Sequence, residues 1–166
     1  LEEAVNEEQG KAPKEPECAA DLNVTANIDK DYVQRGEERM DLYRRMAAIR
    51  TEDDAEDLLD EIVDRYGEPP KGVLNLIDVA LLRAKAAKIG ICDIRQKANE
   101  VNFTMTVLDF EAVSAVCGDA QYQNRVLFVP DAKQPTVRLR LLGNKDSLRQ
   151  SKAFVERFAA CRTGTN

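Results

Sequence analysis

Hydrophobic residues recur at helical spacing from residue 51 to residue 66, in a stretch that is otherwise mostly acidic. At about 100° per residue, one side of a helix would carry Ala55, Leu58, Leu59, Ile62 and Tyr66. The opposite side would carry Asp53, Asp57, Asp60 and Asp64. Thr51 suits the N-cap and Gly67 suits the position after the last turn. The pattern therefore predicts a helix that packs on one face and presents a row of carboxylates on the other.

Further stretches show the same helical period. A helix is predicted from residue 36 to about residue 50, with Met40, Tyr43, Met46, Ala47 and Ile49 on its apolar row. Residues 73–89 predict a long helix whose first half is apolar almost all round, which is typical of a central helix, and Gly90 follows as a C-terminal stop. A short helix is predicted at 110–116, and an amphipathic one at 147–158.

Alternation of apolar and polar residues predicts the strands. Leu22, Val24, Ala26 and Ile28 alternate with polar residues, which indicates a strand over 22–28. Residues 91–107 read as a hairpin with its turn at Asn99-Glu100, and 125–129 and 136–142 are also strand-like. The fold class predicted is α+β. Its first half is helical with three main helices, packed with a small, mainly antiparallel sheet and a C-terminal helix.

The predicted domain organisation is simple. Residues 1–16 have the composition of the end of a preceding helix followed by a polar connector with Gly10, Pro13 and Pro16. Residues 17–161 then form a single domain, which suits the size of one hydrophobic core. Residues 162–166 are expected to be a frayed tail.

Composition excludes several classes of protein. The formal net charge is −6 and the pI is about 4.9, whereas proteins that track nucleic-acid phosphates display concentrated basic patches. No apolar run approaches the roughly 20 residues that span a bilayer, and the first residues are acidic, unlike a basic and apolar leader. We therefore expect a cytoplasmic protein without a membrane partner.

The sequence contains few of the residues and motifs that catalysis requires. The chain has no histidine, and its four cysteines, Cys18, Cys92, Cys117 and Cys161, are too widely spaced for a structural zinc site. There is no phosphate-binding glycine loop and no serine in a nucleophile elbow. A carboxylate pair such as Asp57 with Glu61 or Asp64 remains conceivable, although carboxylates on a helix surface in water keep ordinary acidity. No metal, cofactor or catalytic residue is therefore expected.

The acidic row itself allows two interpretations. It is either a solvated helix face or a docking surface for cations, because like charges one turn apart repel and the helix contains almost no lysine or arginine to offset them. The cations that relieve this repulsion would come from a separate surface or from five arginines just upstream. These are Arg35, Arg39, Arg44, Arg45 and Arg50.

The residues from Glu61 to Pro70, EIVDRYGEPP, followed by a helix that ends KIGI at residues 88–91, resemble the carboxy-terminal domain of bacterial transcription-repair coupling factors. That family has roughly E-L-x-D-R-F/Y-G-x-x-P, then V-x-N-L-L, then A-x-K-L-G-I. Residues 38–47 and 21–33 resemble two upstream blocks of the family, and the likeness covers about residues 1–92. The chain departs from the family at Asp29 and Gln34, where proline is usual.

This resemblance implies a non-enzymatic, autoinhibitory domain. In the family it follows an ATP-dependent DNA translocase and packs in cis on an amino-terminal, UvrB-like module. It thereby hides the surface that recruits UvrA until stalled RNA polymerase is engaged. RNA polymerase and DNA are contacted only through other domains. The Glu and Asp of the family motif correspond to Glu61 and Asp64, and Asp57, Asp60 and Arg65 are further candidate partner-binding residues.

An alternative reading belongs to a different class of function. The same chain would be a nucleic-acid-handling accessory module of a DNA translocase, with Arg35, Arg39, Arg44 and Arg45 against phosphate. Glu37, Glu38 and Asp41 interrupt that cluster of arginines.

Overall fold

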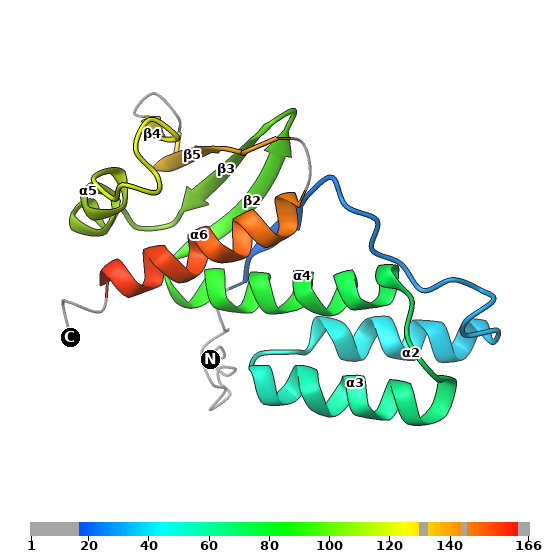
Figure 1. Cartoon of the computed structure of the whole chain (residues 1–166). Coiled ribbons are helices and arrows are strands. Elements are labelled where there is room, and N and C mark those ends of the chain that lie inside the picture. The colour runs from blue at the N-terminus through cyan, green and yellow to red at the C-terminus, as the bar shows by residue number, and fades with distance from the viewer. Residues whose placement is uncertain (1–16, 130–132, 144–145, 163–166) are drawn as a thin grey trace, which may run out of the picture.

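The computed structural model describes residues 17–129, 133–143 and 146–162, and these form an α+β fold, as predicted. The helices are α2 (Gly36–Ala47), α3 (Glu52–Tyr66), α4 (Lys71–Lys88), α5 (Phe110–Cys117) and α6 (Ser147–Arg162). The strands are β1 (Ala19–Asp21), β2 (Ile91–Lys97), β3 (Glu100–Met105), β4 (Val126–Val129) and β5 (Thr136–Arg140). The three helices of the first half precede the β2–β3 hairpin, and α6 closes the described chain (Figure 1).

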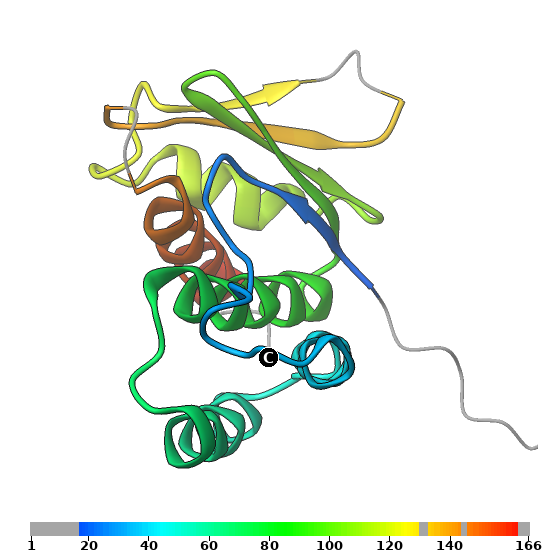
Figure 2. The same cartoon turned by 90° about the vertical axis from the view of Figure 1, so that its right-hand side faces the viewer.

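The five strands form one sheet in the order β1-β2-β3-β5-β4. Strand β1 pairs with β2 in parallel, and all other pairs are antiparallel. Figure 2 shows the helices gathered on one side of this sheet. The predicted hairpin is confirmed, with Lys97 opposite Glu100. Its turn falls on Ala98, at φ 55°, and Asn99, one residue earlier than predicted.

The predicted strand over 22–28 is wrong, because the structure has only the three residues of β1 there. The exposure of 22–28 still alternates, and Ile28 is buried. Its backbone N–H groups bond to side chains and to a helix, without a strand ladder. The Asn23 N–H donates to the Gln96 side chain of β2 at 2.7 Å, the Asn27 N–H donates to the Gly72 carbonyl at 3.2 Å, and the Ile28 N–H donates to the Tyr43 hydroxyl at 2.8 Å. The apolar period thus records which side chains pack on the two cores, and this packing does not require strand pairing.

Helix α4 lies between two clusters of buried side chains, which confirms its predicted central position. Val73, Ile77 and Leu81 pack with α2 and α3, and Leu82 and Ala86 pack with the sheet, α5 and α6. In Figure 1 the helix runs between the α2–α3 pair and the sheet. One helix therefore holds both halves of the fold.

The predicted helix over 36–50 is confirmed as α2, although it ends at Ala47. Its buried face differs from the predicted row, because Leu42 and Met46 are buried while Met40 and Tyr43 are exposed. The predicted division into a connector, one domain and a tail stays a prediction. Residues 1–16 and 163–166, including the predicted preceding helix, lie outside the described residues.

Candidate docking surface

Helix α3 begins and ends where its sequence predicts. The Thr51 side chain accepts from the Asp54 N–H at 3.0 Å, and the Asp54 carboxylate accepts from the Thr51 N–H at 3.2 Å, so that the two form a capping box. At the other end Gly67 adopts φ 88°, a conformation that favours glycine. Ala55, Leu58 and Ile62 are buried, which fixes the rotation of the helix.

This rotation places the predicted acidic row on the surface. We call Asp53, Asp57, Asp60 and Asp64 the acidic ridge, and all four side chains are exposed. The structure shows no hydrogen bond or ion pair from any of these four carboxylates to another described residue. Four negative charges thus stand along three turns of a helix without a cation from the described part of the fold, and their mutual repulsion favours binding of an external cation.

Glu61, at the border of the ridge, has a cationic partner within the domain. Arg45 donates to its two carboxylate oxygens at 2.8 and 2.6 Å, in the bidentate geometry that guanidinium and carboxylate favour. Arg65 lies 3.7 Å from the same carboxylate. The hydrogen bond from Arg45 lowers the pKa of Glu61, and the same bond raises the pKa of Arg45. Glu61 therefore stays ionised and oriented.

Three other upstream arginines contact residues that are close to them in the sequence. Arg39 donates to the Val33 and Gln34 carbonyls at 2.7 and 3.0 Å. Arg35 and Arg44 lie 3.7 Å from Glu38 and Asp41. The sequence could not single out Arg45 among the five, because that choice depends on the rotation of α2, which the sequence misjudged.

Aromatic contacts fix α3 against its neighbours. The Tyr66 hydroxyl donates to Glu38 of α2 at 2.9 Å, and the Tyr32 hydroxyl donates to the Gly67 carbonyl at 2.6 Å. The two rings lie 5.8 Å apart, and the Arg65 guanidinium lies 5.1 Å from the Tyr66 ring centre. These contacts, which the sequence did not predict, make the acidic ridge part of a rigid platform.

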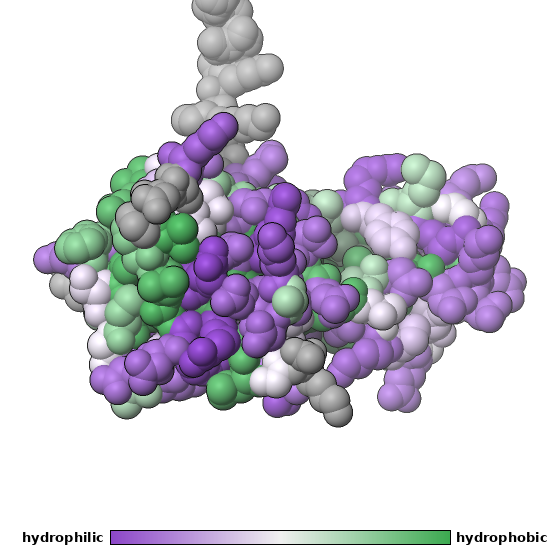
Figure 3. Space-filling model, turned by 90° about the horizontal axis from the view of Figure 1, so that it is seen from above, coloured by the Kyte–Doolittle hydropathy of each residue, from purple (hydrophilic) through white to green (hydrophobic). Residues whose placement is uncertain are grey.

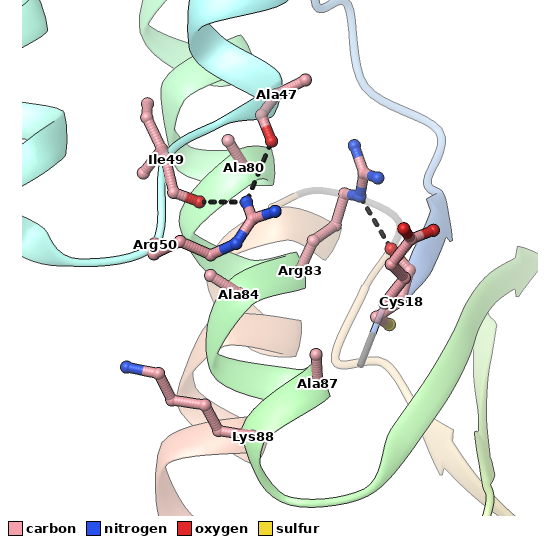
Figure 4. A pocket seen from close by; sticks show the side chains of 10 residues that line it. Cys18, Ala47, Ile49, Arg50, Ala80, Arg83, Ala84, Ala87 and Lys88 are labelled. Atoms are coloured by element: carbon pink, nitrogen blue, oxygen red, sulfur yellow. Dashed lines mark hydrogen bonds between the residues drawn. The ribbon is translucent and has the colours of Figure 1, made fainter. Parts of the chain in front are cut away.

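A hollow of about 440 Å³ lies elsewhere, between α4, the end of α2 and the start of β1 (Figure 4). Two of its three cationic side chains donate to backbone carbonyls. Arg50 donates to the Ala47 and Ile49 carbonyls, each at 3.0 Å, and Arg83 donates to the Cys18 carbonyl at 2.7 Å. Burial raises the pKa of the Cys18 thiol to about 12, so this cysteine is not a ready nucleophile.

Over residues 17–129, 133–143 and 146–162, no cluster of three or more cysteine and carboxylate side chains is placed to hold a metal ion. Within the same ranges, no helix has the length and apolarity that a membrane span requires.

The structure thus defines a class of protein, an α+β domain that carries a rigid, exposed acidic helix face. A family model, TRCF domain, matches residues 22–113, and the chain belongs to this TRCF domain family. Its curated relatives include transcription-repair-coupling factors of Staphylococcus aureus strain USA300, 32% identical over 110 residues, and Staphylococcus haemolyticus strain JCSC1435, 28% identical over 109 residues. Each alignment covers 64% of this chain but only 9% of the relative.

A solved structure gives the same fold. It is the crystal structure of the C-terminal domain of a transcription-repair coupling factor, with a TM-score of 0.72 at 18% sequence identity. The match covers 91% of this chain and 98% of that one. The family resemblance is therefore confirmed, by a match over residues 22–113, and the fold likeness covers 91% of the chain, including much of the part where the sequence pattern was uninformative.

Proposed function

We propose that this domain is a non-catalytic, autoinhibitory clamp of a transcription-repair coupling factor. It docks in cis on an amino-terminal, UvrB-like module, and it masks the surface that recruits UvrA. RNA polymerase and DNA are engaged through other domains of the longer, cytoplasmic protein. One observation carries this proposal above all. The four carboxylates of the acidic ridge are exposed on a rigid helix and have no cation among the described residues.

The expected ligands of the ridge are arginines of the partner module. A guanidinium binds carboxylates in a planar, bidentate geometry, and each charge-assisted contact contributes about 1.5 to 3 kcal/mol when it is shielded from water. Two or three such contacts suffice for a latch that opens again, because allosteric coupling energies are typically about 1 to 3 kcal/mol.

The Arg45–Glu61 pair refines which residues act. Since Glu61 already accepts both hydrogen bonds of an internal guanidinium, an incoming arginine meets a carboxylate that is partly neutralised. Asp57, Asp60 and Asp64 are therefore the stronger candidates for direct contact. Glu61 and Arg65 form the border of the docking surface, where Glu61 orients the charges beside the ridge.

Charge reversal in the full-length protein tests this assignment. Asp57→Lys with Asp64→Lys should leave the fold intact, since each new lysine lies one turn from an acidic residue, Glu61 or Asp60. Binding to UvrA should become about tenfold tighter or more, the effect of losing roughly 1.4 kcal/mol of clamp contact. The matched control is Asp31→Lys with Glu111→Lys, two exposed acids outside α3, and it should bind UvrA like the parent. Unchanged UvrA binding by the ridge variant would refute the clamp at these residues.

The nucleic-acid alternative has its own test. Duplex and single-stranded DNA would be titrated with the isolated chain at several salt concentrations. A phosphate-binding module would give micromolar affinity that falls steeply with salt. The clamp proposal predicts no such binding, because Arg35, Arg39, Arg44 and Arg45 already contact carbonyls or carboxylates of the domain.

A further inference from the structure

We propose that strand β4 docks an extended segment of a partner polypeptide, which adds to the sheet as a further strand. Strand β4 is the last in the order β1-β2-β3-β5-β4, so it pairs on one side only. Natural edge strands are usually protected by their shortness, a lysine, a proline or a bulge. Strand β4 is short and lies between Arg125 and Pro130 in the sequence, but the strand itself, VLFV, has no charge or proline, and its register with β5 is regular.

The hydrogen-bond pattern identifies the free main-chain groups of this edge. The Arg140 N–H donates to the Arg125 carbonyl at 2.7 Å, so 125 and 140 form a hydrogen-bonded pair. By the alternation of an antiparallel ladder, Val126 and Phe128 direct their main-chain groups away from β5. The Val126 N–H donates to the Tyr122 carbonyl at 3.2 Å. The Phe128 N–H and C=O therefore face outward, and no described residue is bonded to them.

Exposed apolar side chains occur on β4 and on the segment that leads into α5. Leu127 is 57% exposed, and beyond β3 the loop and the start of α5 expose Val107 to 73% and Phe110 to 65%. Helix α5 contacts β4 from the side that holds the core. Figure 3 shows hydrophobic side chains gathered at the end of the molecule where β4 and α5 lie. Exposed apolar patches of this kind mark interaction sites.

The charge near this edge indicates which side chains the partner segment carries. Leu127 and Val129 share one face of the sheet, and Arg140 of β5 lies on the same face. Arg125 is held within the fold, because it donates to the Arg140 and Gln121 carbonyls and to the side chain of Gln150 in α6. Arg140 donates to the Asn124 carbonyl, just before β4, and has no carboxylate within 4 Å in the described part of the chain. An antiparallel partner strand would thus place apolar residues beside Val129 and Leu127, and then an acidic residue within reach of Arg140.

A second copy of this chain fits the edge poorly. Each chain carries a formal net charge of −6, so two copies repel. The structure favours a different polypeptide, whose segment reads apolar, any residue, apolar, any residue, acidic. This mode is β-strand addition, in which main-chain bonds give affinity and alternate side chains give specificity.

A synthetic peptide provides the test. The blocked peptide Thr-Val-Thr-Val-Thr-Glu would be titrated into the isotope-labelled chain and followed by amide NMR. We expect saturable shifts confined to β4 and the start of α5, and slower hydrogen exchange at Phe128. The same peptide with Gln in place of Glu should bind more weakly at low salt. Arg140→Gln should remove that difference between the two peptides.

Two leucines supply matched variants. Leu127→Lys should abolish the shifts, because it charges the edge beside the docking strand. Leu142→Lys, at a leucine 65% exposed beyond the end of β5, should leave peptide binding unchanged. The proposal is overturned if the peptide leaves β4 unperturbed, or if Leu127→Lys binds like the parent. It is also overturned if the chain alone dimerises and Leu127→Lys abolishes the dimer, since the occupant would then be a second copy.

Discussion

The carboxylate of Glu61 shows how one side chain serves both fold and surface. It accepts two hydrogen bonds from Arg45 of α2, while its neighbours on the acidic ridge project into solvent. Both side chains of the pair remain more than a third exposed, so the pair orients charge more than it stabilises the fold. The family resemblance marked Glu61 as a candidate partner-binding residue, and the structure supplies an arginine partner for it from within the domain.

This pair makes the stability of the domain depend on pH. Because Arg45 lowers the pKa of Glu61 below its ordinary value of 4.5, the unfolded chain takes up a proton more readily than the folded one. The stabilisation is therefore present above pH 4.5 and is lost as the pH falls through the folded-state pKa. Arg45→Gln should lower the thermal midpoint at pH 7 more than at pH 3. Arg44→Gln, whose contact with Asp41 is 3.7 Å long and exposed, is the control and should show no such difference. Equal losses for Arg45→Gln at both pH values would contradict this account.

Ser151 is a second residue whose effect on the free energy of unfolding can be tested. Its side chain is fully buried in α6, and its hydroxyl has no hydrogen-bond partner among the described residues. A buried polar group without a partner costs about 1 to 3 kcal/mol. Ser151→Ala should therefore raise the free energy of unfolding by about 1 kcal/mol in chemical denaturation. Ser114→Ala, at an exposed serine of α5, should gain no more than a few tenths of a kcal/mol. A destabilised Ser151→Ala chain would show that the hydroxyl has a partner.

At the scale of elements, the helices were the most predictable part. Thr51, Gly67 and Gly90 marked the ends of α3 and α4 correctly, because capping and left-handed stops depend on neighbouring residues. The alternation over 22–28 gave a wrong strand prediction. Alternation indicates which side chains are buried, but it does not indicate whether a strand or a helix covers them. Similarly, the acidic face of α3 followed from its period, but the choice of Arg45 required the packing of α2.

The contact between segment 22–28 and α4 depends on Gly72. A Cβ atom on Gly72 would lie 2.9 Å from the Asn27 carbonyl oxygen and 2.6 Å from its side-chain oxygen. Gly72→Ala should thus lower the free energy of unfolding by about 1 to 3 kcal/mol, although alanine is the better helix former. Gly36→Ala in α2 would meet only the end of Arg39, at 3.5 Å, and should not destabilise the chain. Denaturant titration of both variants decides, and a stabilised Gly72→Ala chain would contradict the close approach.

Over the whole molecule, α4 ties two clusters of buried side chains into one unit. The α2–α3 pair, which carries the acidic ridge, packs on one side of α4, and the sheet with α5 and α6 packs on another side. Because α4 joins the two clusters, the position of α3 is stabilised by the entire fold. The fold class and the central helix were predictable from apolar period and order, whereas the free edge at β4 emerged only from the strand order.

Cooperative unfolding tests this arrangement. Leu82, on the sheet side of α4, is fully buried, and Leu82→Ala should cost about 2 to 5 kcal/mol. Fluorinated tyrosine would report on both halves, since Tyr32 and Tyr66 lie with α2 and α3 while Tyr122 lies with the sheet. Both sets of signals should lose stability equally. Leu74→Ala, at an exposed position of α4, is the control. Loss of the Tyr122 signal alone would show two independent units.

The most direct measurement of the central claim is binding in trans. The chain would be added to the isolated amino-terminal, UvrB-like module that the proposal assigns to the full-length protein, and competition with UvrA would be followed. The account predicts saturable binding that weakens with salt, displaces UvrA, and is lost when Asp57→Lys and Asp64→Lys are combined. If the chain fails to displace UvrA, or if the ridge variant displaces it as well as the parent does, the acidic ridge is not the clamp.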